Sequence, residues 1–356
     1  MKKKKILFVL PNLKAGGSER VISFVSQNLN KDKFETRLIV LGHSKDSMFK
    51  ISSIPVDFLN KNRLLTSSFE LIKKIHFEKP DVVISTISHL NIFMGILSIF
   101  FRKTKFIGRE SSVISKMQEY TSVNQRLYNF LIKITYNQLS VIICQSEDMR
   151  IDFIERYKIN PDKLILIHNP ITGFLNPIRH QLNPKLIRFI TVGRLSREKG
   201  YSRILLGLSK IRGYSFTYTV IGSGSMGDEI KALAMQLGLS KFINYIPSTT
   251  EVEKYLASHD VYLQGSFVEG FPNALMESCA VGTPVIAFNC PGGTREIIIN
   301  GANGYLVENQ TEFELIISKI ENFNHFNLNI IKNSVIDKFN SKVIINKYES
   351  ILNSSR

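Results

Sequence analysis

Short apolar runs alternate with longer amphipathic stretches along this chain, and the alternation restricts its fold more than any other feature. Five runs rich in Ile and Val come first, at Ile6–Leu10, Thr36–Leu41, Val82–Ser85, Lys105–Gly108 and Val141–Cys144. Helical patterns separate them, at Ser18–Leu29, Leu64–Glu78, Asn91–Phe101 and Asn124–Leu139. Strands that are buried on both faces have continuous apolar runs, so this order predicts a parallel, doubly wound α/β sheet.

The alternation stops once and then begins again, which indicates two domains. Residues 169–186 hold three prolines among Asn and Gly, a composition typical of a linker. A second series of strands is expected at Phe189–Val192, Tyr218–Ile221, Val261–Gln264 and Pro284–Phe288. We therefore predict two Rossmann-like domains that face a central cleft, at 1–175 and 176–340. A last helix, 341–356, is expected to cross back to the first domain.

The charge of the chain is strongly positive and lies almost wholly in its first half. The formal net charge is +16, and residues 1–180 contain 28 Lys+Arg against 15 Asp+Glu. Such a field attracts nucleic acid, anionic lipid or a phosphorylated substrate, although it also serves solubility alone. Because no aromatic-rich nucleic-acid motif accompanies it, we expect no nucleic-acid partner.

Neither a leader nor a membrane span is expected from the sequence. The apolar run Ile6–Leu10 ends at Pro11, and Ile92–Phe101 is far shorter than the roughly 20 residues that cross a bilayer. The three cysteines form no C-x-x-C pair, which favours a reducing compartment. We expect a cytoplasmic protein, either soluble or peripheral to the membrane.

Three loops after predicted strands have the residues that phosphate binding requires. Gly16 and Gly17 open a helix that Ser18 is placed to cap, and a helix N-terminus favours an anion. After the strand at 189–192, Arg194 and Lys199 are spaced to clamp a diphosphate. The third loop begins at Gly222 and lacks the last glycine of a dinucleotide fingerprint. For the first two loops, the alternative interpretation is a purely structural turn.

The segment Glu269–Glu277 has the densest set of candidate site residues. Pro272 suits the first turn of a helix, so Glu269 is expected just before the helix and Glu277 inside it. Glu269 can accept hydroxyl donors from a sugar, and Glu277 those of a ribose. Backbone amides near the helix start are further candidates, at Phe271, Asn273 and Ala274. No D-x-D motif or spaced histidine pair is present, so we expect no metal.

Together, the E-x7-E element 269–277, the block Gly193–Gly200 and the turn 16–19 resemble the GT-B retaining glycosyltransferases of family 4, also called glycosyl transferases group 1. The closest resemblance is to members that build lipid-linked cell-surface oligosaccharides. It covers essentially the whole chain and is looser in the first domain. It implies that the second domain binds a nucleoside-diphosphate sugar, by family habit a UDP-sugar, and that the first domain binds the acceptor.

The resemblance also implies a role for each matching residue. Arg194 and Lys199 would hold the donor diphosphate, Glu277 the ribose and Glu269 the transferred sugar. The amides of Gly16 and Gly17 would meet the diphosphate. Thr294 would open a further phosphate-facing loop. Where many members have a histidine near the reacting carbon, this chain has Arg109-Glu110. The acceptor candidates are His89, Asn91, Arg109 and Glu110. For His89 the alternative is a histidine that is satisfied at the start of a helix.

The expected activity is transfer of a hexose or N-acetylhexosamine to a glycan acceptor linked to polyprenyl diphosphate, in the synthesis of a cell-surface polysaccharide. The alternatives are a nucleotide-sugar epimerase of the same fold and a non-catalytic accessory subunit that binds sugar nucleotide. The basic first domain is expected to bind an anionic membrane surface, with the apolar stretch 92–101 beside Arg102, Lys103 and Lys105 as the candidate contact. The alternative for this apolar stretch is an ordinary buried helix.

Overall fold

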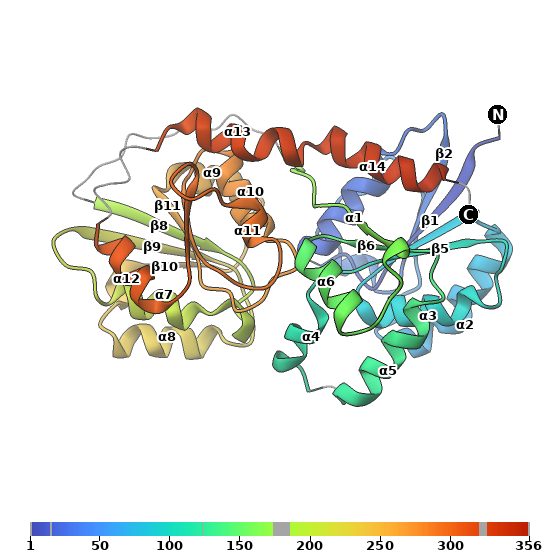
Figure 1. The fold of residues 1–356 in the computed structure, drawn as a ribbon, viewed down its shortest axis with the longest axis horizontal. Coiled ribbons are helices and arrows are strands. Elements are labelled where there is room, and N and C mark those ends of the chain that lie inside the picture. Colours follow the sequence, from blue (N-terminus) through green and yellow to red (C-terminus); the bar gives the residue numbers. More distant parts are fainter. Residues whose placement is uncertain (1, 15, 123, 174–185, 320–325, 355–356) are drawn as a thin grey trace. The chain divides into compact units, whose positions relative to one another are not determined.

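The computed structural model describes residues 2–14, 16–122, 124–173, 186–319 and 326–354. The chain divides into two compact units (Figure 1). Unit 1 contains Met1–Thr172 and Ser341–Arg356, and unit 2 contains Gly173–Asn340. Most of the expected linker, including the boundary at residues 175 and 176, lies outside the described residues.

Unit 1 is built on a seven-stranded parallel sheet. Its strands are β1 (Lys4–Leu10), β2 (Phe34–Val40), β3 (Val56–Phe58), β4 (Val82–Thr86), β5 (Lys105–Arg109), β6 (Val141–Cys144) and β7 (Leu164–Leu166). The order across the sheet is β3-β2-β1-β4-β5-β6-β7, so the direction of winding reverses between β1 and β4. Its helices are α1 (Gly17–Asn28), α2 (Leu64–Glu78), α3 (Ser88–Ser98), α4 (Ile114–Met117), α5 (Gln125–Tyr136), α6 (Glu147–Glu155) and α14 (Ser341–Asn353).

Unit 2 repeats the arrangement with six parallel strands. They are β8 (Leu186–Val192), β9 (Ser215–Ile221), β10 (Ile243–Ile246), β11 (Val261–Gln264), β12 (Val285–Phe288) and β13 (Gly304–Val307), in the order β10-β9-β8-β11-β12-β13. Here the winding reverses between β8 and β11. Its helices are α7 (Tyr201–Leu208), α8 (Gly227–Gln236), α9 (Val252–Ser258), α10 (Asn273–Ala280), α11 (Thr294–Ile297), α12 (Gln310–Ser318) and α13 (Leu328–Phe339). The predicted class, two doubly wound α/β sheets, is confirmed.

The apolar runs found in the sequence form the centres of both sheets. All of Ile6–Leu10 and Val141–Cys144 is buried, because helices cover both faces of each sheet. The strands that the sequence analysis missed are short and lie at or next to the sheet edges, as β3 and β13 do. Most of them have a mixed composition with no continuous apolar run, although β7 is wholly apolar. An edge strand pairs on one side only and tolerates such sequences.

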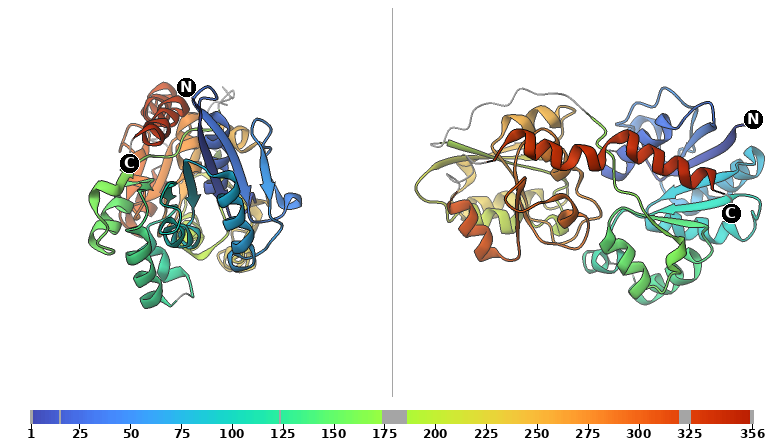
Figure 2. Two further views of the ribbon diagram at one scale, coloured as in Figure 1. Left: turned by 90° about the vertical axis from the view of Figure 1, so that its right-hand side faces the viewer. Right: turned by 45° about the horizontal axis from the view of Figure 1, so that its top comes forward.

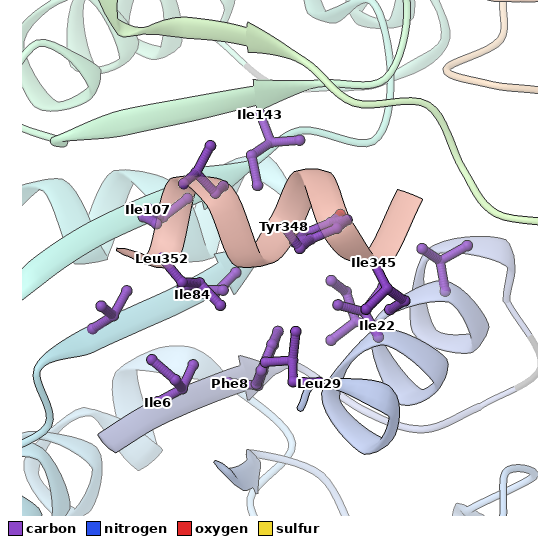
Figure 3. Close-up of a cluster of buried hydrophobic side chains, with 14 of the residues drawn as sticks. Ile6, Phe8, Ile22, Leu29, Ile84, Ile107, Ile143, Ile345, Tyr348 and Leu352 are labelled. Carbon is purple, nitrogen blue, oxygen red and sulfur yellow. The ribbon is translucent and has the colours of Figure 1, made fainter. Parts of the chain in front are cut away.

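The C-terminal helix α14 packs on the sheet of unit 1. Its buried side chains Ile344, Tyr348 and Leu352 recur every four residues and so share one helical face. Figure 3 shows Tyr348 and Leu352 over sheet residues such as Ile84, with Ile345 near α1. Figure 2 shows α14 over the sheet from further directions. Residues more than 300 positions apart in the sequence thus share one core.

Lys105 belongs to this interface and not to a membrane-facing surface, which corrects the expectation from the sequence. Its side chain is buried, and Nζ donates to the Ile351 carbonyl at 3.0 Å and to Ser354 Oγ at 2.9 Å. In the stretch 92–101, Ile92 and Leu97 are buried as well. None of the helices described by the structure is long and apolar enough to cross a membrane.

Candidate active site

In unit 2, the candidate residues follow four different strands and gather at one edge of the sheet. Arg194 and Lys199 follow β8, Gly222 follows β9, Glu269 follows β11, and Thr294 follows β12. The carboxyl ends of parallel strands meet at the same edge. The point between β8 and β11, where the winding reverses, is where such sheets bind ligands. Lys199 and Glu269 come from the two loops at this point.

Lys199 and Glu269 form a two-pronged ion pair. Lys199 Nζ lies 2.6 Å from Glu269 Oε1 and 2.8 Å from Oε2. Ser266 Oγ donates a third hydrogen bond, of 2.6 Å, to Oε1. The carboxylate is 8% exposed and the lysine 27% exposed, so the pair is only partly screened by water. The residues that the sequence analysis assigned to the diphosphate and to the transferred sugar are therefore in direct contact, whereas Arg194 is exposed to solvent.

Two glycines of these loops are required by the protein's own backbone. Gly200 has φ +58°, and a Cβ there would lie 1.9 Å from the Gly265 carbonyl oxygen. A Cβ at Gly222 would lie 1.9 Å from the carbonyl oxygen of Gly193. The glycine at 222 thus allows the loop after β9 to pack on the loop after β8, just before Arg194. This is a structural reason for a glycine that the sequence analysis had assigned to ligand binding.

Arg203 holds the loop that leads to Glu269, a role that no pattern in the sequence predicts. From the first turn of α7, its guanidinium donates to the carbonyls of Gly265 and Ser266. The guanidinium carbon also lies 3.8 Å from the ring centroid of Phe267 and 4.0 Å from that of Phe288. Such stacking adds to the hydrogen bonds. A single arginine in a helix belongs to no sequence motif that would predict such contacts with a distant loop.

Helix α10 carries Glu277 into the interior of unit 2. The helix begins at Asn273, so Pro272 lies just before its first turn and not within it. Glu277 is buried, and Tyr262 on β11 lies near both carboxylates of the element. Burial, Glu269 and Glu277 all raise the pKa of Tyr262, which stays a neutral hydroxyl. Its hydroxyl donates to the Val192 carbonyl at 3.3 Å.

The remaining candidates of unit 2 differ in exposure. Phe271 is buried with its ring against Phe339, while Asn273 and Ala274 are half-buried at the start of α10. Thr294 is fully buried, and Gln264 Nε2 donates to its hydroxyl at 3.1 Å. That hydroxyl is thus bonded inside the unit. Among the described residues, no group of three or more His, Cys, Asp or Glu side chains is arranged to hold a metal ion.

In unit 1, the glycine turn begins helix α1 as expected, but Ser18 does not cap it. The helix starts at Gly17, with Gly16 at the N-cap position and no side-chain cap. Ser18 Oγ lies 2.9 Å from Thr86 Oγ1 and accepts from Arg109 Nη1 at 3.0 Å. Since Thr86 ends β4, Ser18 joins the two loops at the winding reversal of this sheet. The capping prediction is wrong because Ser18 lies inside the first turn.

Arg109 is a buried junction rather than a surface group. Its side chain is 0% exposed. Besides Ser18, it donates from Nη2 to Asn169 Oδ1 at 2.6 Å, and it lies beside the Tyr348 hydroxyl of α14. Asn169 lies near the end of the first segment of unit 1, which ends at Thr172, and Tyr348 lies in its second segment, which begins at Ser341. Arg109 therefore connects the glycine turn to both of these segments.

Glu110 lies in a buried network of hydroxyl groups. It accepts from Tyr136 at 2.6 Å, from Ser88 at 3.0 Å and from the Ser111 amide at 2.8 Å. Burial raises the pKa of Glu110 above its ordinary value, against the effect of these donors. Asn91 is buried in the same network, through its bond to the Tyr136 hydroxyl.

Among the four acceptor candidates, only His89 has an exposed side chain. It lies in the first turn of α3, directly after Ser88. Asn91, Arg109 and Glu110 lie beneath the surface. Of the four candidates, His89 alone is thus accessible at the surface of unit 1. The three buried side chains fix the positions of the neighbouring loops.

Two doubly wound parallel sheets, each with candidate residues in the loops at the carboxyl ends of its strands, define a GT-B architecture. Known proteins share this architecture. The crystal structure of Anabaena HepE in complex with UDP superposes with a TM-score of 0.79 at 20% identity, covering 99% of this chain and 100% of that one. A curated glycosyltransferase of uncharacterized function from Haemophilus influenzae is 27% identical over 319 residues, 88% of each chain.

Two family profiles together account for most of the sequence. Glycosyltransferase Family 4 matches residues 15–172, and Glycosyl transferases group 1 matches residues 176–334. A Campylobacter jejuni relative, 25% identical and covering 86% of this chain and 87% of its own length, is described as an N-acetylgalactosamine-N,N'-diacetylbacillosaminyl-diphospho-undecaprenol 4-alpha-N-acetylgalactosaminyltransferase. The chain belongs to the GT-B glycosyltransferases of this group and is itself a glycosyltransferase.

Proposed function

We propose that this protein is a retaining glycosyltransferase that moves a hexose or N-acetylhexosamine from a UDP-sugar to a glycan linked to polyprenyl diphosphate. The product would enter synthesis of a cell-surface polysaccharide at the cytoplasmic face of the membrane. The observation that carries the proposal is the Lys199–Glu269 pair at the winding reversal of unit 2. It brings a cation for a diphosphate and a carboxylate for a sugar to one point.

The donor would bind along the carboxyl edge of the unit 2 sheet. Arg194 is exposed and able to reach a diphosphate, and Lys199 lies one loop turn further on. The diphosphate would compete with Glu269 for Lys199. Donor binding would then release the carboxylate toward the transferred sugar. Glu277 would accept the ribose hydroxyls from α10, and Gly16 and Gly17 would offer their amides to the diphosphate.

The bond between the anomeric carbon and the diphosphate would break, and the acceptor hydroxyl would bond to that carbon on the same face of the sugar. The hydroxyl proton would pass to the leaving diphosphate. Positive charge grows on the sugar in the transition state, and negative charge grows on the leaving phosphate. Arg194 and Lys199 would act where that negative charge develops, which is the most effective use of fixed cations. Glu269 would act on the sugar side. With two cations at the diphosphate, no divalent metal is required.

The acceptor class rests on relatives and on the charge of unit 1. The Campylobacter jejuni relative is described as acting on a diphospho-undecaprenol substrate, and a second one from that organism, 24% identical, as acting on a PP-undecaprenol substrate. The basic excess of residues 1–180 is suited to an acceptor that carries a diphosphate and lies at an anionic surface. His89, exposed at the start of α3, is the first candidate to contact it.

A donor panel tests the proposal. The purified protein is incubated with UDP-, GDP- and dTDP-linked hexoses and N-acetylhexosamines, and release of nucleotide and sugar is followed. Slow hydrolysis of a UDP-sugar, with retention at the anomeric carbon, is expected. Interconversion of two donors would instead indicate an epimerase, and binding without turnover would indicate an accessory subunit. Transfer to a polyprenyl-diphosphate-linked glycan then tests the acceptor.

A further inference from the structure

Helices α3 and α5 lie side by side on one face of the unit 1 sheet (Figure 1). They approach closely at Gly95, where a Cβ would lie only 2.2 Å from the Thr135 carbonyl oxygen. One turn further, Ser98 Oγ donates to the Gln138 carbonyl at 3.2 Å. Because no side chain separates the two backbones here, the outward side chains of both helices form one continuous surface.

That surface is rich in large apolar side chains. The most exposed are Phe100, at 75%, and Phe130, at 58%. The full set consists of Ile96, Ile99, Phe100, Leu127, Phe130 and Ile134. Ile96 lies on α3, and Ile99 and Phe100 lie in the turn that directly follows it. Spacings of three and four residues place the other three on one side of α5. Soluble proteins rarely leave such a group uncovered, and an uncovered group of this kind usually marks a binding surface.

The charges on this surface all have one sign. Residues 86–105 and 124–141, which contain both helices and the turn after α3, hold no Asp or Glu. The exposed cations among them are Arg102, Lys103, Arg126 and Lys133. The six apolar side chains and these four cations are called the α3–α5 face below. Two copies of the chain paired through it would bring like charges together, whereas an anionic lipid surface complements them.

We propose that the α3–α5 face docks the protein on an anionic lipid bilayer. Phe100 and Phe130 would enter the boundary between headgroups and acyl chains, and the four cations would lie at the level of the lipid phosphates. This inference rests on the proposed function, which requires access to a membrane-bound acceptor. It differs from the surface expected from the sequence, because Lys105, Ile92 and Leu97 are buried and α5 supplies half of the face.

The chain contains no tryptophan, so a single introduced one reports on its own site. We would compare Phe100→Trp and Phe130→Trp with Met235→Trp, whose residue is 70% exposed on α8 of unit 2. Each variant is mixed with phosphatidylglycerol or phosphatidylcholine vesicles, with and without bromine-labelled acyl chains. The first two should show a blue-shifted emission and quenching by brominated phosphatidylglycerol, and Met235→Trp should show neither. About 1 M salt should reverse the association, since it shortens the Debye length to about 3 Å.

Neutralising single cations tests how much each contributes to the affinity for anionic vesicles. Each of Arg102→Gln, Lys103→Gln, Arg126→Gln and Lys133→Gln should weaken binding to phosphatidylglycerol vesicles about fivefold, since a basic residue near such a surface contributes ~1 kcal/mol. A Phe100→Ser/Phe130→Ser variant should lose vesicle binding. It should also lose transfer to a vesicle-embedded acceptor while it hydrolyses a soluble donor at the unchanged rate.

Three outcomes would overturn the inference. They are no spectral change with either lipid, equal responses to both lipids, or a blue shift that appears without vesicles as protein concentration rises. The last of these would assign the face to self-association. The inference and the proposed function can fail separately: absence of donor turnover in the unchanged protein contradicts the enzyme proposal and leaves the vesicle measurements as they are.

Discussion

Lys199 Nζ lies within 2.8 Å of both carboxylate oxygens of Glu269, although 70 residues separate them in the sequence. Their contact follows from the topology, because β8 and β11 are neighbours in the sheet and each residue follows one of them. In this ion pair, the charges of the ammonium group and the carboxylate neutralise each other. A diphosphate that takes Lys199 would leave Glu269 with its bond from Ser266 and free to face a sugar.

We predict that Glu269→Gln lowers kcat by about 10²-fold or more and changes donor KM little. A carboxylate beside the reacting sugar matters most as positive charge develops there, and the loss of one such electrostatic contact has this magnitude. Donor binding should not suffer, because Lys199 loses its competing partner. Steady-state kinetics of donor hydrolysis measures both constants.

Glu277→Gln provides the comparison and should behave in the opposite way. Ribose contacts change little along the reaction, so their weakening raises KM and leaves kcat nearly constant. Equal increases in KM for both variants, with turnover intact, would show that the two carboxylates do not divide the roles as proposed. Circular dichroism of each variant checks that the buried substitution leaves the fold unchanged.

We predict that activity survives chelation of divalent cations. In the proposed donor site, Arg194 and Lys199 would neutralise the diphosphate, so a divalent cation would not be needed there. Donor turnover is measured after dialysis against EDTA and again after addition of magnesium or manganese. Loss of turnover that either ion restores would contradict the proposal.

The central strands and the second-unit motifs were predictable because they depend on local sequence. Short apolar runs between helical patterns, such as Val141–Cys144, indicate buried strands. The spacing from Glu269 to Glu277 likewise follows from one loop and one helix. The edge strand β3 was missed because three residues of mixed character give no pattern.

Contacts between distant segments were beyond what local patterns contain. The expectation that Lys105 faces a membrane failed because its partners come from Ile351 and Ser354, about 250 residues later. Arg109 was a candidate for contact with the acceptor, but its buried side chain bonds to Ser18 and Asn169. These three residues come from separate segments of the chain. For long charged side chains, the sequence predicts that a charge is present but does not reveal which distant group it bonds.

We predict that Glu110 makes stability fall as pH rises. Its pKa is raised in the folded protein, so between the unfolded value near 4.5 and the folded value the native state keeps a proton that the unfolded state has lost. The free energy of unfolding therefore decreases with pH across that window and is then level. Glu110→Gln lacks this titration.

The test is the difference between the two proteins in urea unfolding at a series of pH values. Relative to Glu110→Gln, the unchanged protein should lose stability as pH rises above about 4.5, while other titrating groups cancel in the difference. Parallel curves for the two proteins would mean that Glu110 ionises in the folded state as easily as in the unfolded state.

We predict that Lys105→Met lowers the free energy of unfolding by about 1–3 kcal/mol, whereas Lys103→Met changes it by no more than about 0.5 kcal/mol. Lys105 is buried and bonds to the Ile351 carbonyl and Ser354 Oγ at the end of α14, while Lys103 is exposed two residues earlier. Met keeps the length and apolar character of the lysine stem, so the difference isolates the ammonium group. Urea unfolding measures it, and amide hydrogen exchange should localise the loss of protection to 344–353. If exchange there stays as slow as in the unchanged protein, Lys105 does not hold the helix, and apolar packing by Tyr348 and Leu352 suffices.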